Sequence, residues 1–333
     1  MPRPNATPPP NAVHGLTASA IHRFGPPMQY GLHRLCALTL LLGLALCRVA
    51  LAQTIQAQTI QAGAIQWDAI PHTEGHFFTT SDGVRLHYLE AGPRAAHTVV
   101  FVPGWTMPAW IWRPQIVAFS RAYHVIAFDP RGQGDSEVAP DGYDPQRRGQ
   151  DINELLAHLG PAPALVVGWS LGVLDTLADV HVAGDARFAG LVLVDNSVGE
   201  EPPPTPRKPS HARPLPHEVF MRAFIRSMFR TPQTPAYLDR LTATALRTPE
   251  PAAHALLNYP VPRTYWREAV YAARVPVLYV VRPGLSGQAG NLQRNRPDTE
   301  TAVFADAGHA LFVDDAARFN ALMQDFIYRH VWP

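Results

Sequence analysis

A serine flanked by glycines is the strongest chemical signal in the sequence. Ser170 lies at the centre of the pentapeptide GWSLG, residues 168–172, directly after an apolar run and directly before a helical pattern, residues 171–182. In a strand–turn–helix context such a serine sits on a tight, strained turn that exposes its hydroxyl. Gly168 and Gly172 would keep that turn free of side-chain clashes. We therefore predict that Ser170 is a nucleophile and that both glycines are structural.

Short apolar runs alternate with helical patterns along most of the chain, and these elements must position the serine. An Asp82-Gly83 pair predicts a hairpin turn between two strand-like segments at 76–80 and 84–91. Asp314 and Asp315 are placed to favour the N-terminus of the last helix. The alternation predicts a mostly parallel sheet covered by helices on both faces. Apolar runs typical of buried strands occupy 97–102, 123–128, 164–169, 190–195, 275–281 and 301–305, and helical spacing occupies 146–159, 171–182 and 319–327.

Two further motifs follow strand-like runs. The sequence VPGW occupies residues 102–105, and DPRGQGDS occupies residues 129–136. Together with GWSLG and the strand–helix order, they resemble the α/β-hydrolase superfamily over roughly residues 76–330, in particular its serine esterase and cofactor-free haloperoxidase-like branch. The resemblance implies an α/β fold with an eight-stranded, mostly parallel sheet, helices on both faces and a helical cap insertion. The DPRGQGDS loop would have a structural role.

The resemblance also implies where the negative charge of a reaction intermediate would be held. In the superfamily, the backbone amide that follows a strand-end glycine and the amide after the nucleophile donate to the oxyanion. Here these would be the amides of Trp105, after Gly104, and of Leu171. Pro103 stands where relatives commonly have histidine. Because the mechanism needs the glycine turn and the next amide, we expect the oxyanion hole to survive this change.

A nucleophilic serine needs a base, and the base needs an acid. The superfamily's Gly-His position matches His309, which would take the serine proton and return it to the leaving group. Most relatives carry the acid after the strand matched by 275–281, but no carboxylate follows there before Asp298. Some superfamily members carry it one strand earlier, which points to Asp195. The alternatives are Asp298, Glu200, Glu201 or no acid at all.

The N-terminal part of the sequence has the pattern of an export signal. Arg34 precedes the apolar run 35–46, which is short for a membrane span, and the triplet ALA ends at Ala52. We predict a signal peptide cleaved after about Ala52 and a periplasmic or secreted protein without stable membrane insertion. An uncleaved membrane anchor is the alternative, and Met28 is an alternative start.

One stretch interrupts the alternation of strands and helices. Residues 198–265 begin with many prolines and continue with helix-like pieces without strand runs. Because the stretch lies between two predicted core strands, we interpret it as a helical cap with a surface connection at its start. The predicted organisation is therefore a signal peptide at 1–52, a flexible lead-in at 53–75, a hydrolase core at 76–197 and 266–333, and a cap at 198–265.

Together these features predict a serine hydrolase that cleaves carboxylic ester or lactone bonds of a small molecule through an acyl-enzyme. The alternatives are an acyltransferase using the same site and a ligand-binding module on the same fold, which the missing standard acid suggests. The superfamily's epoxide hydrolases use an aspartate nucleophile, so Ser170 argues against that activity. We expect no metal or organic cofactor and, with 28 basic and 27 acidic residues, no nucleic-acid partner.

Overall fold

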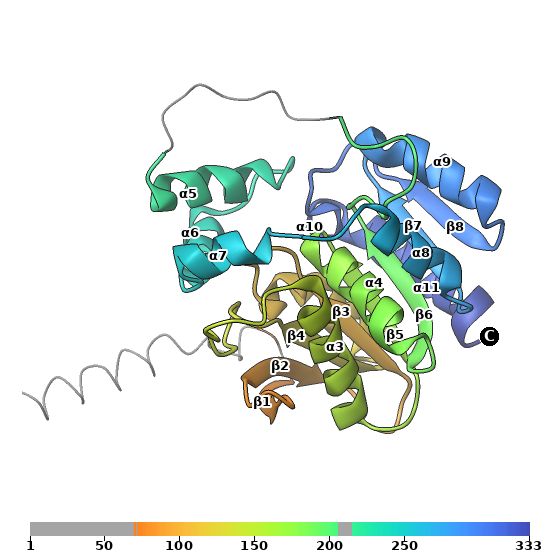
Figure 1. Ribbon diagram of the computed structural model, residues 1–333, viewed down its shortest axis with the longest axis horizontal. Helices are drawn as coiled ribbons and strands as arrows, with labels where there is room; N and C mark the ends of the chain where they lie inside the picture. The colour runs from red at the N-terminus through yellow and green to blue at the C-terminus, as the bar shows by residue number, and fades with distance from the viewer. Residues whose placement is uncertain (1–69, 71, 206–214) are drawn as a thin grey trace, which may run out of the picture. The chain divides into compact units, whose positions relative to one another are not determined.

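Eight strands form one sheet in the order β1-β2-β4-β3-β5-β6-β7-β8 (Figure 1). β1 pairs with β2, and β2 with β4, in the antiparallel sense, and every other neighbouring pair is parallel. The predicted eight-stranded, mostly parallel sheet is therefore confirmed. The strands are β1 (Thr73–Thr79), β2 (Arg85–Ala91), β3 (Thr98–Val102), β4 (His124–Asp129), β5 (Ala164–Trp169), β6 (Phe188–Val194), β7 (Val277–Val281) and β8 (Thr299–Val303).

The computed structural model describes residue 70, residues 72–205 and residues 215–333. The predicted signal peptide and most of the predicted lead-in lie outside these residues. Within the described part of the chain, no helix has the length and apolar character needed to cross a bilayer.

The first strand begins earlier than the sequence pattern indicates. Thr73 pairs with Ala91 at the start of the β1–β2 ladder, so three residues of the predicted lead-in belong to the sheet. The expected turn follows β1, where Gly83 has a φ of 85° and the amide of Thr80 donates to the carbonyl of Val84 at 2.9 Å. β1 is an edge strand whose sequence alternates weakly, and backbone pairing with β2 extends it beyond the predicted start.

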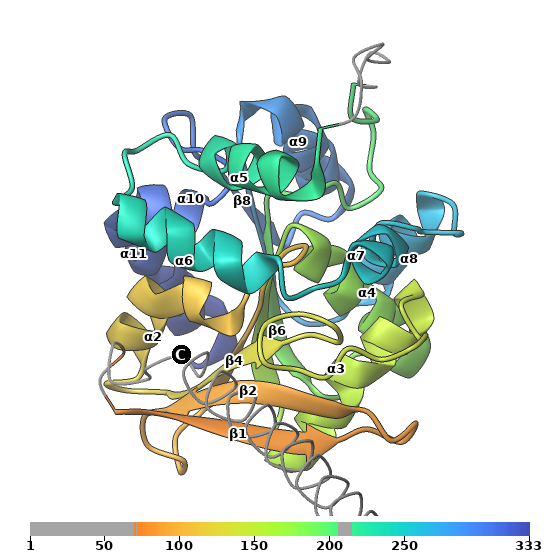
Figure 2. The same ribbon diagram turned by 90° about the vertical axis from the view of Figure 1, so that its left-hand side faces the viewer.

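Helices cover both faces of the sheet. Figure 2 shows the sheet nearly edge-on, with helices on its two sides. Because both faces are covered, the central strands β3 and β5 are almost continuously buried, as expected of parallel strands. One face carries α3 (Pro145–Leu159), α4 (Leu171–Ala183) and α8 (Thr264–Ala272), and the other carries α2 (Arg113–Phe119) and α11 (Ala316–Phe326). The remaining elements of the core are η2 (Ala109–Trp112), η3 (Pro283–Leu285), α9 (Ser286–Asn295), α10 (Leu311–Asp314) and η4 (Ile327–Val331).

The two acidic residues before the last long helix have different partners. Asp315 is the N-cap of α11, where its side chain accepts from the amide of Arg318 at 3.4 Å. Asp314 instead accepts backbone amides from other segments, including that of Gly308 at 2.6 Å. The expectation that both residues serve the helix N-terminus is therefore correct for Asp315 and wrong for Asp314, because long-range donors occupy the latter carboxylate.

The described residues of the connection between β6 and β7 form four helices: α5 (His217–Ser227), α6 (Pro235–Ala245), α7 (Glu250–Leu256) and α8. α5 to α7 fall within the stretch predicted as a cap, and we use "cap" for residues 215–263. α8 crosses the predicted cap boundary and packs against α4, where the indole of Trp266 donates to the carbonyl of Leu174 at 3.2 Å. The division into core and cap stays a prediction.

The helix that follows Ser170 contains a deeply buried acid. Burial raises the pKa of Asp179 to about 8, although Asn153 and Arg187 favour its ionised form. The folded protein therefore keeps a proton on this carboxyl over a pH range in which the unfolded chain releases it. Its contribution to the free energy of unfolding is full below about pH 4 and is lost as the pH rises towards 8.

We predict that Asp179→Asn flattens the pH dependence of stability. Between pH 5 and pH 8 the wild type should lose about 1–3 kcal/mol more of its free energy of unfolding than the variant does. Urea unfolding at both pH values measures this difference, and Asp239→Asn, at an exposed acid on α6, is the control. Equal pH dependence in the wild type and Asp179→Asn would contradict the prediction.

Candidate active site

Ser170 occupies the turn between β5 and α4. Its φ of 54° lies in the left-handed region, which costs a non-glycine residue about 1–3 kcal/mol and persists where the surroundings hold it. One such restraint is the hydrogen bond from the Ser170 amide to the carbonyl of Val194, at 2.9 Å, at the end of β6. The strained turn predicted from the pentapeptide is thus present, with Ser170 at the N-terminus of α4.

The three glycines predicted to be structural stand where no side chain fits. A Cβ at Gly168 would lie 2.4 Å from the carbonyl oxygen of Gly172, and one at Gly172 would lie 2.4 Å from that of Val102. A Cβ at Gly104 would lie 2.9 Å from the Cβ of Ser170. These short approaches bring the end of β3 against the turn that carries Ser170, and larger residues would force the two segments apart.

Hydrogen bonds join Ser170, His309 and Asp195 into one chain. The Nε2 atom of His309 lies 2.9 Å from the Oγ of Ser170, and its Nδ1 atom lies 2.6 Å from Oδ2 of Asp195. The loop after β8 brings in His309, and Asp195 directly follows β6. Among the described residues, Asp195 is the carboxylate that contacts His309. The alternatives Asp298, Glu200 and Glu201 have no contact with it in this part of the chain.

The Asp195 carboxylate is fully buried and held from two sides. Arg282, the residue after β7, donates its backbone amide to Oδ1 at 3.0 Å and its Nε to Oδ2 at 2.5 Å. Burial opposes ionisation of Asp195, but the hydrogen bond and charge of His309, together with Arg282, hold the pKa of this carboxyl below its ordinary value. A buried acid with a lowered pKa remains ionised and can stabilise a protonated imidazole beside it.

Arg282 is a residue of the site for which the sequence predicted no role. Its position was a signal nonetheless, because it follows the strand after which most relatives carry the acid. A carboxylate at the end of β6 faces the start of the β7 loop, so a cation at that point can balance its buried charge.

The two amides expected to form an oxyanion hole lie on segments that meet at Ser170. Leu171 is the first residue of α4, and Trp105 follows Gly104 at the end of β3. Neither backbone amide donates a hydrogen bond to any other described residue, so both remain available to a ligand. The indole of Trp105 points into the cap and donates to the carbonyl of Ala253 at 2.7 Å.

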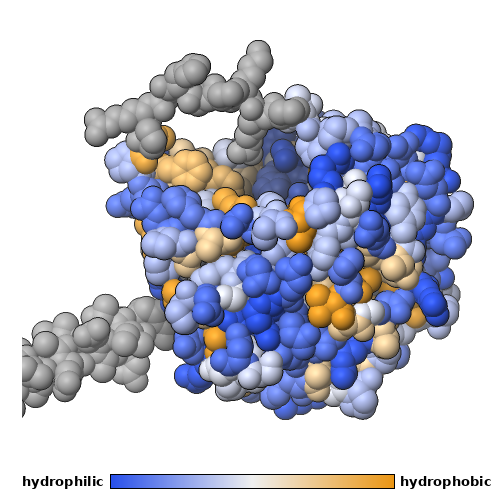
Figure 3. All heavy atoms as spheres, viewed as in Figure 1, coloured by the Kyte–Doolittle hydropathy of each residue, from blue (hydrophilic) through white to orange (hydrophobic). Residues whose placement is uncertain are grey.

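Aromatic rings of the cap contact Trp105. Its ring lies 5.3 Å from that of Phe224 and 6.3 Å from that of Phe220, both on α5. Phe220 is 43% exposed, and Figure 3 shows apolar side chains gathered over α5. An apolar group of a ligand held at the Trp105 amide would find these rings nearby. The other tryptophans near the two strand ends, Trp110, Trp112 and Trp169, are buried core residues.

The DPRGQGDS loop braces the strand ends. Asp129 accepts from the amide of Ala109 at 2.6 Å, the amide of Asp135 at 3.1 Å and the ring of His87 at 2.7 Å. His87, Asp129 and Asp135 are also the three potential metal ligands that lie close together among the described residues. Because protein donors already occupy both oxygens of Asp129, this cluster has a structural explanation.

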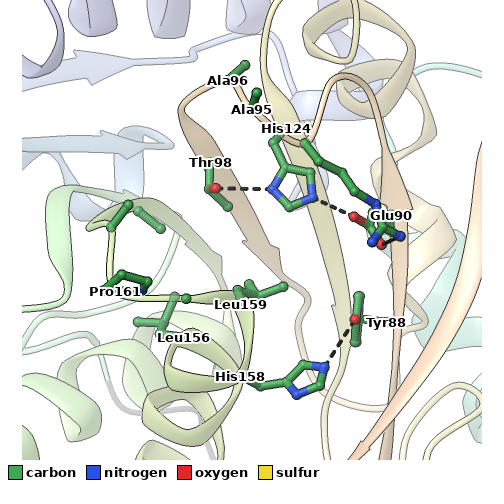
Figure 4. A pocket seen from close by; sticks show the side chains of 14 residues that line it. Tyr88, Glu90, Ala95, Ala96, Thr98, His124, Leu156, His158, Leu159 and Pro161 are labelled. Carbon is green, nitrogen blue, oxygen red and sulfur yellow. Dashed lines mark hydrogen bonds and ion pairs between the residues drawn. The ribbon is translucent and has the colours of Figure 1, made fainter.

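A pocket at the opposite end of the sheet is separate from these groups (Figure 4). In it, His124 lies 2.7 Å from Glu90 and 3.1 Å from Thr98. Thr98 and His124 begin β3 and β4, whereas Ser170 and Asp195 follow the carboxyl ends of β5 and β6. Ligands of parallel sheets bind beyond the carboxyl ends of the strands, which favours the Ser170 end as the active site.

Comparison with known proteins places the chain in a family. The model of the alpha/beta hydrolase family matches residues 99–322. A non-heme chloroperoxidase from Burkholderia pyrrocinia is 33% identical over 145 residues, which are 43% of this chain and 51% of that protein. A bifunctional esterase/perhydrolase from Acinetobacter calcoaceticus is 32% identical over 145 residues, with the same two shares. The chain thus spans about half the length of these curated relatives, and others of them are named as epoxide hydrolases.

The comparison with solved structures agrees with the sequence comparison. The crystal structure of an esterase from Rhodococcus matches with a TM-score of 0.64 at 23% identity, covering 77% of this chain and 99% of that one. At this identity the likeness supports the fold alone. The family model, however, matches more than half of the chain, and the protein therefore belongs to the alpha/beta hydrolase family.

Proposed function

We propose that this protein is a serine hydrolase that cleaves a carboxylic ester or lactone of a small molecule through an acyl-enzyme. The observation that carries the proposal is the hydrogen-bonded chain from Asp195 through His309 to Ser170. A nucleophile, a base and a group that orients the base are the parts that acyl transfer requires. The predicted signal peptide would place this activity in the periplasm or outside the cell.

In the proposed mechanism each proton has a path. With Nδ1–H donated to Asp195, Nε2 of His309 is free to accept the Ser170 proton as Oγ attacks the carbonyl carbon. The protonated imidazole then gives that proton to the leaving alcohol, and the C–O bond to the alcohol breaks. Water then attacks the acyl-enzyme and loses its proton to His309, which gives that proton to Oγ of Ser170 as the acyl C–O bond breaks, releasing the acid and restoring the serine hydroxyl.

Charge on the carbonyl oxygen develops beside the two free amides. Donors at Trp105 and Leu171 would stabilise the tetrahedral intermediate, and one such donor typically contributes about 3 kcal/mol to the lowering of the barrier. The rings of Trp105 and Phe224 lie next to this position, which favours substrates with an apolar group. An epoxide hydrolase activity, found by name among the relatives, has less support because the strand-end nucleophile position holds serine.

The proposal predicts that Ser170→Ala abolishes hydrolysis of short nitrophenyl esters and labelling by a fluorophosphonate probe. Asp195→Asn should reduce kcat by about 10²- to 10⁴-fold, because the imidazole loses the partner that orients it. Steady-state kinetics and peptide mapping of the labelled protein measure both effects. Asp298→Asn, at an exposed acid away from His309, is the matched control and should leave kcat unchanged.

Two results would contradict these assignments separately. If Asp195→Asn keeps full turnover while Ser170→Ala is inactive, the acid is misassigned. If the wild type neither turns over esters nor reacts with the probe, a ligand-binding module on this fold is the better description. An acyltransferase would be labelled at Ser170 but would transfer the acyl group to an added alcohol in preference to water.

Arg282 gives a prediction for the pH dependence. Arg282→Gln removes the positive charge beside Asp195, so the pKa of this carboxyl should rise towards its ordinary value. The acid limb of the kcat/KM profile should then move to higher pH, because the Asp195 carboxylate loses its charge at a higher pH in the variant. Arg294→Gln, at an exposed position on α9, is the control. An unchanged acid limb in Arg282→Gln would contradict a role for this charge.

A further inference from the structure

The loop that carries His309 is attached to the rest of the protein on both sides of the imidazole. On one side the amide of Gly308 donates to Oδ2 of Asp314 at 2.6 Å, and on the other the amide of Ala310 donates to the carbonyl of Met228 at 2.9 Å. The carbonyl of His309 itself accepts from the indole of Trp169 at 2.8 Å. Met228 is the residue after α5, so one of these attachments comes directly from the cap.

Asp314 connects the same loop to the cap a second time. Its Oδ2 atom also accepts from the backbone amide of Arg230 at 2.7 Å. Its Oδ1 atom accepts from the backbone amide of Thr231 at 3.1 Å and from the hydroxyl of Thr231 at 2.5 Å. One carboxylate therefore binds the amide beside His309 and the cap segment 228–231 together, and hydrogen bonds to a charged acceptor are the stronger kind.

The close packing at this point depends on a glycine. A Cβ at Gly308 would lie 2.4 Å from the carbonyl oxygen of Met228 and 2.8 Å from the amide nitrogen of Arg230. The absence of a side chain lets the cap segment lie directly against the backbone of the histidine loop. The backbones of the two segments are thus in direct contact. We call this contact, between cap residues 228–231 and residues 308–310 with Asp314, the joint.

We propose that the cap segment 228–231 positions the general base, with Asp314 as the positioning residue that transmits its placement to His309. This inference rests on the proposed function of Ser170 and His309 and extends it to residues that touch neither the substrate nor the reacting atoms. Ala310 is bound directly to the cap residue Met228, Gly308 is linked to the cap through Asp314 of α10, and Trp169 in the core binds the carbonyl of His309. The cap therefore sets the rate of the chemical steps as well as access to the site.

The position of His309 matters because proton transfer tolerates only small changes in the distance between the donor and the acceptor. The Nε2 atom of His309 must remain within hydrogen-bond reach of Ser170 and of the leaving group, and displacement of a catalytic group by 1 Å can cost about 100-fold in rate. Releasing the cap segment from Asp314 would free the amide of Gly308 and allow such a displacement. Binding of substrate to the core would be affected much less.

Asp314→Asn tests the proposal, with Asp315→Asn as the matched control. In the asparagine variant an NH₂ group replaces one of two oxygens that both accept N–H donors, so one side of the joint must open. We expect kcat to fall by about 10- to 100-fold with KM within about 3-fold of the wild type. Asp315→Asn makes the same chemical change next door but keeps an acceptor for the N-cap of α11, so it should leave kcat unchanged.

A second variant from the cap side guards against misfolding of the first. Thr231→Val removes one hydroxyl donor to Asp314 while keeping the shape of the side chain, and it should lower kcat by about 2- to 10-fold at nearly unchanged KM. Thr234→Val, in which the hydroxyl that caps α6 is lost instead, is its control. Thr231 and Asp314 act through the same contact. The kcat of the double variant Asp314→Asn/Thr231→Val should therefore be nearly equal to that of Asp314→Asn alone.

The possible results separate this inference from the proposed function. An active wild type whose kcat is unchanged by Asp314→Asn and by Thr231→Val would overturn the positioning role and leave the hydrolase assignment intact. A wild type that neither hydrolyses esters nor reacts with a fluorophosphonate at Ser170 would overturn both. A lower Tm in Asp314→Asn with an unchanged kcat would show that the carboxylate serves stability alone. This result would also overturn the inference.

Discussion

A buried negative charge is the constraint around which this site is organised. The carboxylate of Asp195 has no exposed surface, and a buried unpaired charge costs several kcal/mol. The structure compensates it with the ring of His309, with the backbone amide of Arg282 and with the guanidinium of Arg282. These partners come from two other strand ends, with Arg282 after β7 and His309 after β8, so the charge is stable only if β6, β7 and the loop after β8 keep their relative positions.

The parallel sheet provides that arrangement because it gathers the carboxyl ends of its strands at one edge. Ser170 follows β5, Asp195 follows β6, Arg282 follows β7 and Trp105 follows β3 closely. Side chains from neighbouring strand ends can therefore meet with little extra structure. Two non-glycine residues with positive φ, Ser170 at 54° and Asp195 at 52°, lie at this edge, and both side chains contact His309.

Much of this could be predicted from the sequence because the relevant signals are local. The strand–glycine–serine–helix order identified Ser170, and the apolar runs located the strands to within a few residues. Asp195 was favoured because some members of the superfamily carry the acid at the end of this strand, and the structure puts it beside His309. Arg282 and Asp314 were not assigned their contacts, because their partners lie far away in the sequence and no periodicity or turn motif reports such pairing. The start of β1 was missed for a related reason, since its pairing with β2 extends past the alternating pattern.

The most direct test of the central claim is to trap the acyl group. Mixing the enzyme with a nitrophenyl ester should release a rapid burst of about one equivalent of nitrophenol per protein chain before slower turnover. Acid quenching during the burst and peptide mass analysis should find the acyl group on Ser170. Full turnover without a burst and with Ser170 unmodified would show slow acylation or a different chemistry. The account would be contradicted if the acyl group were stably bound to another residue and that residue were required for turnover.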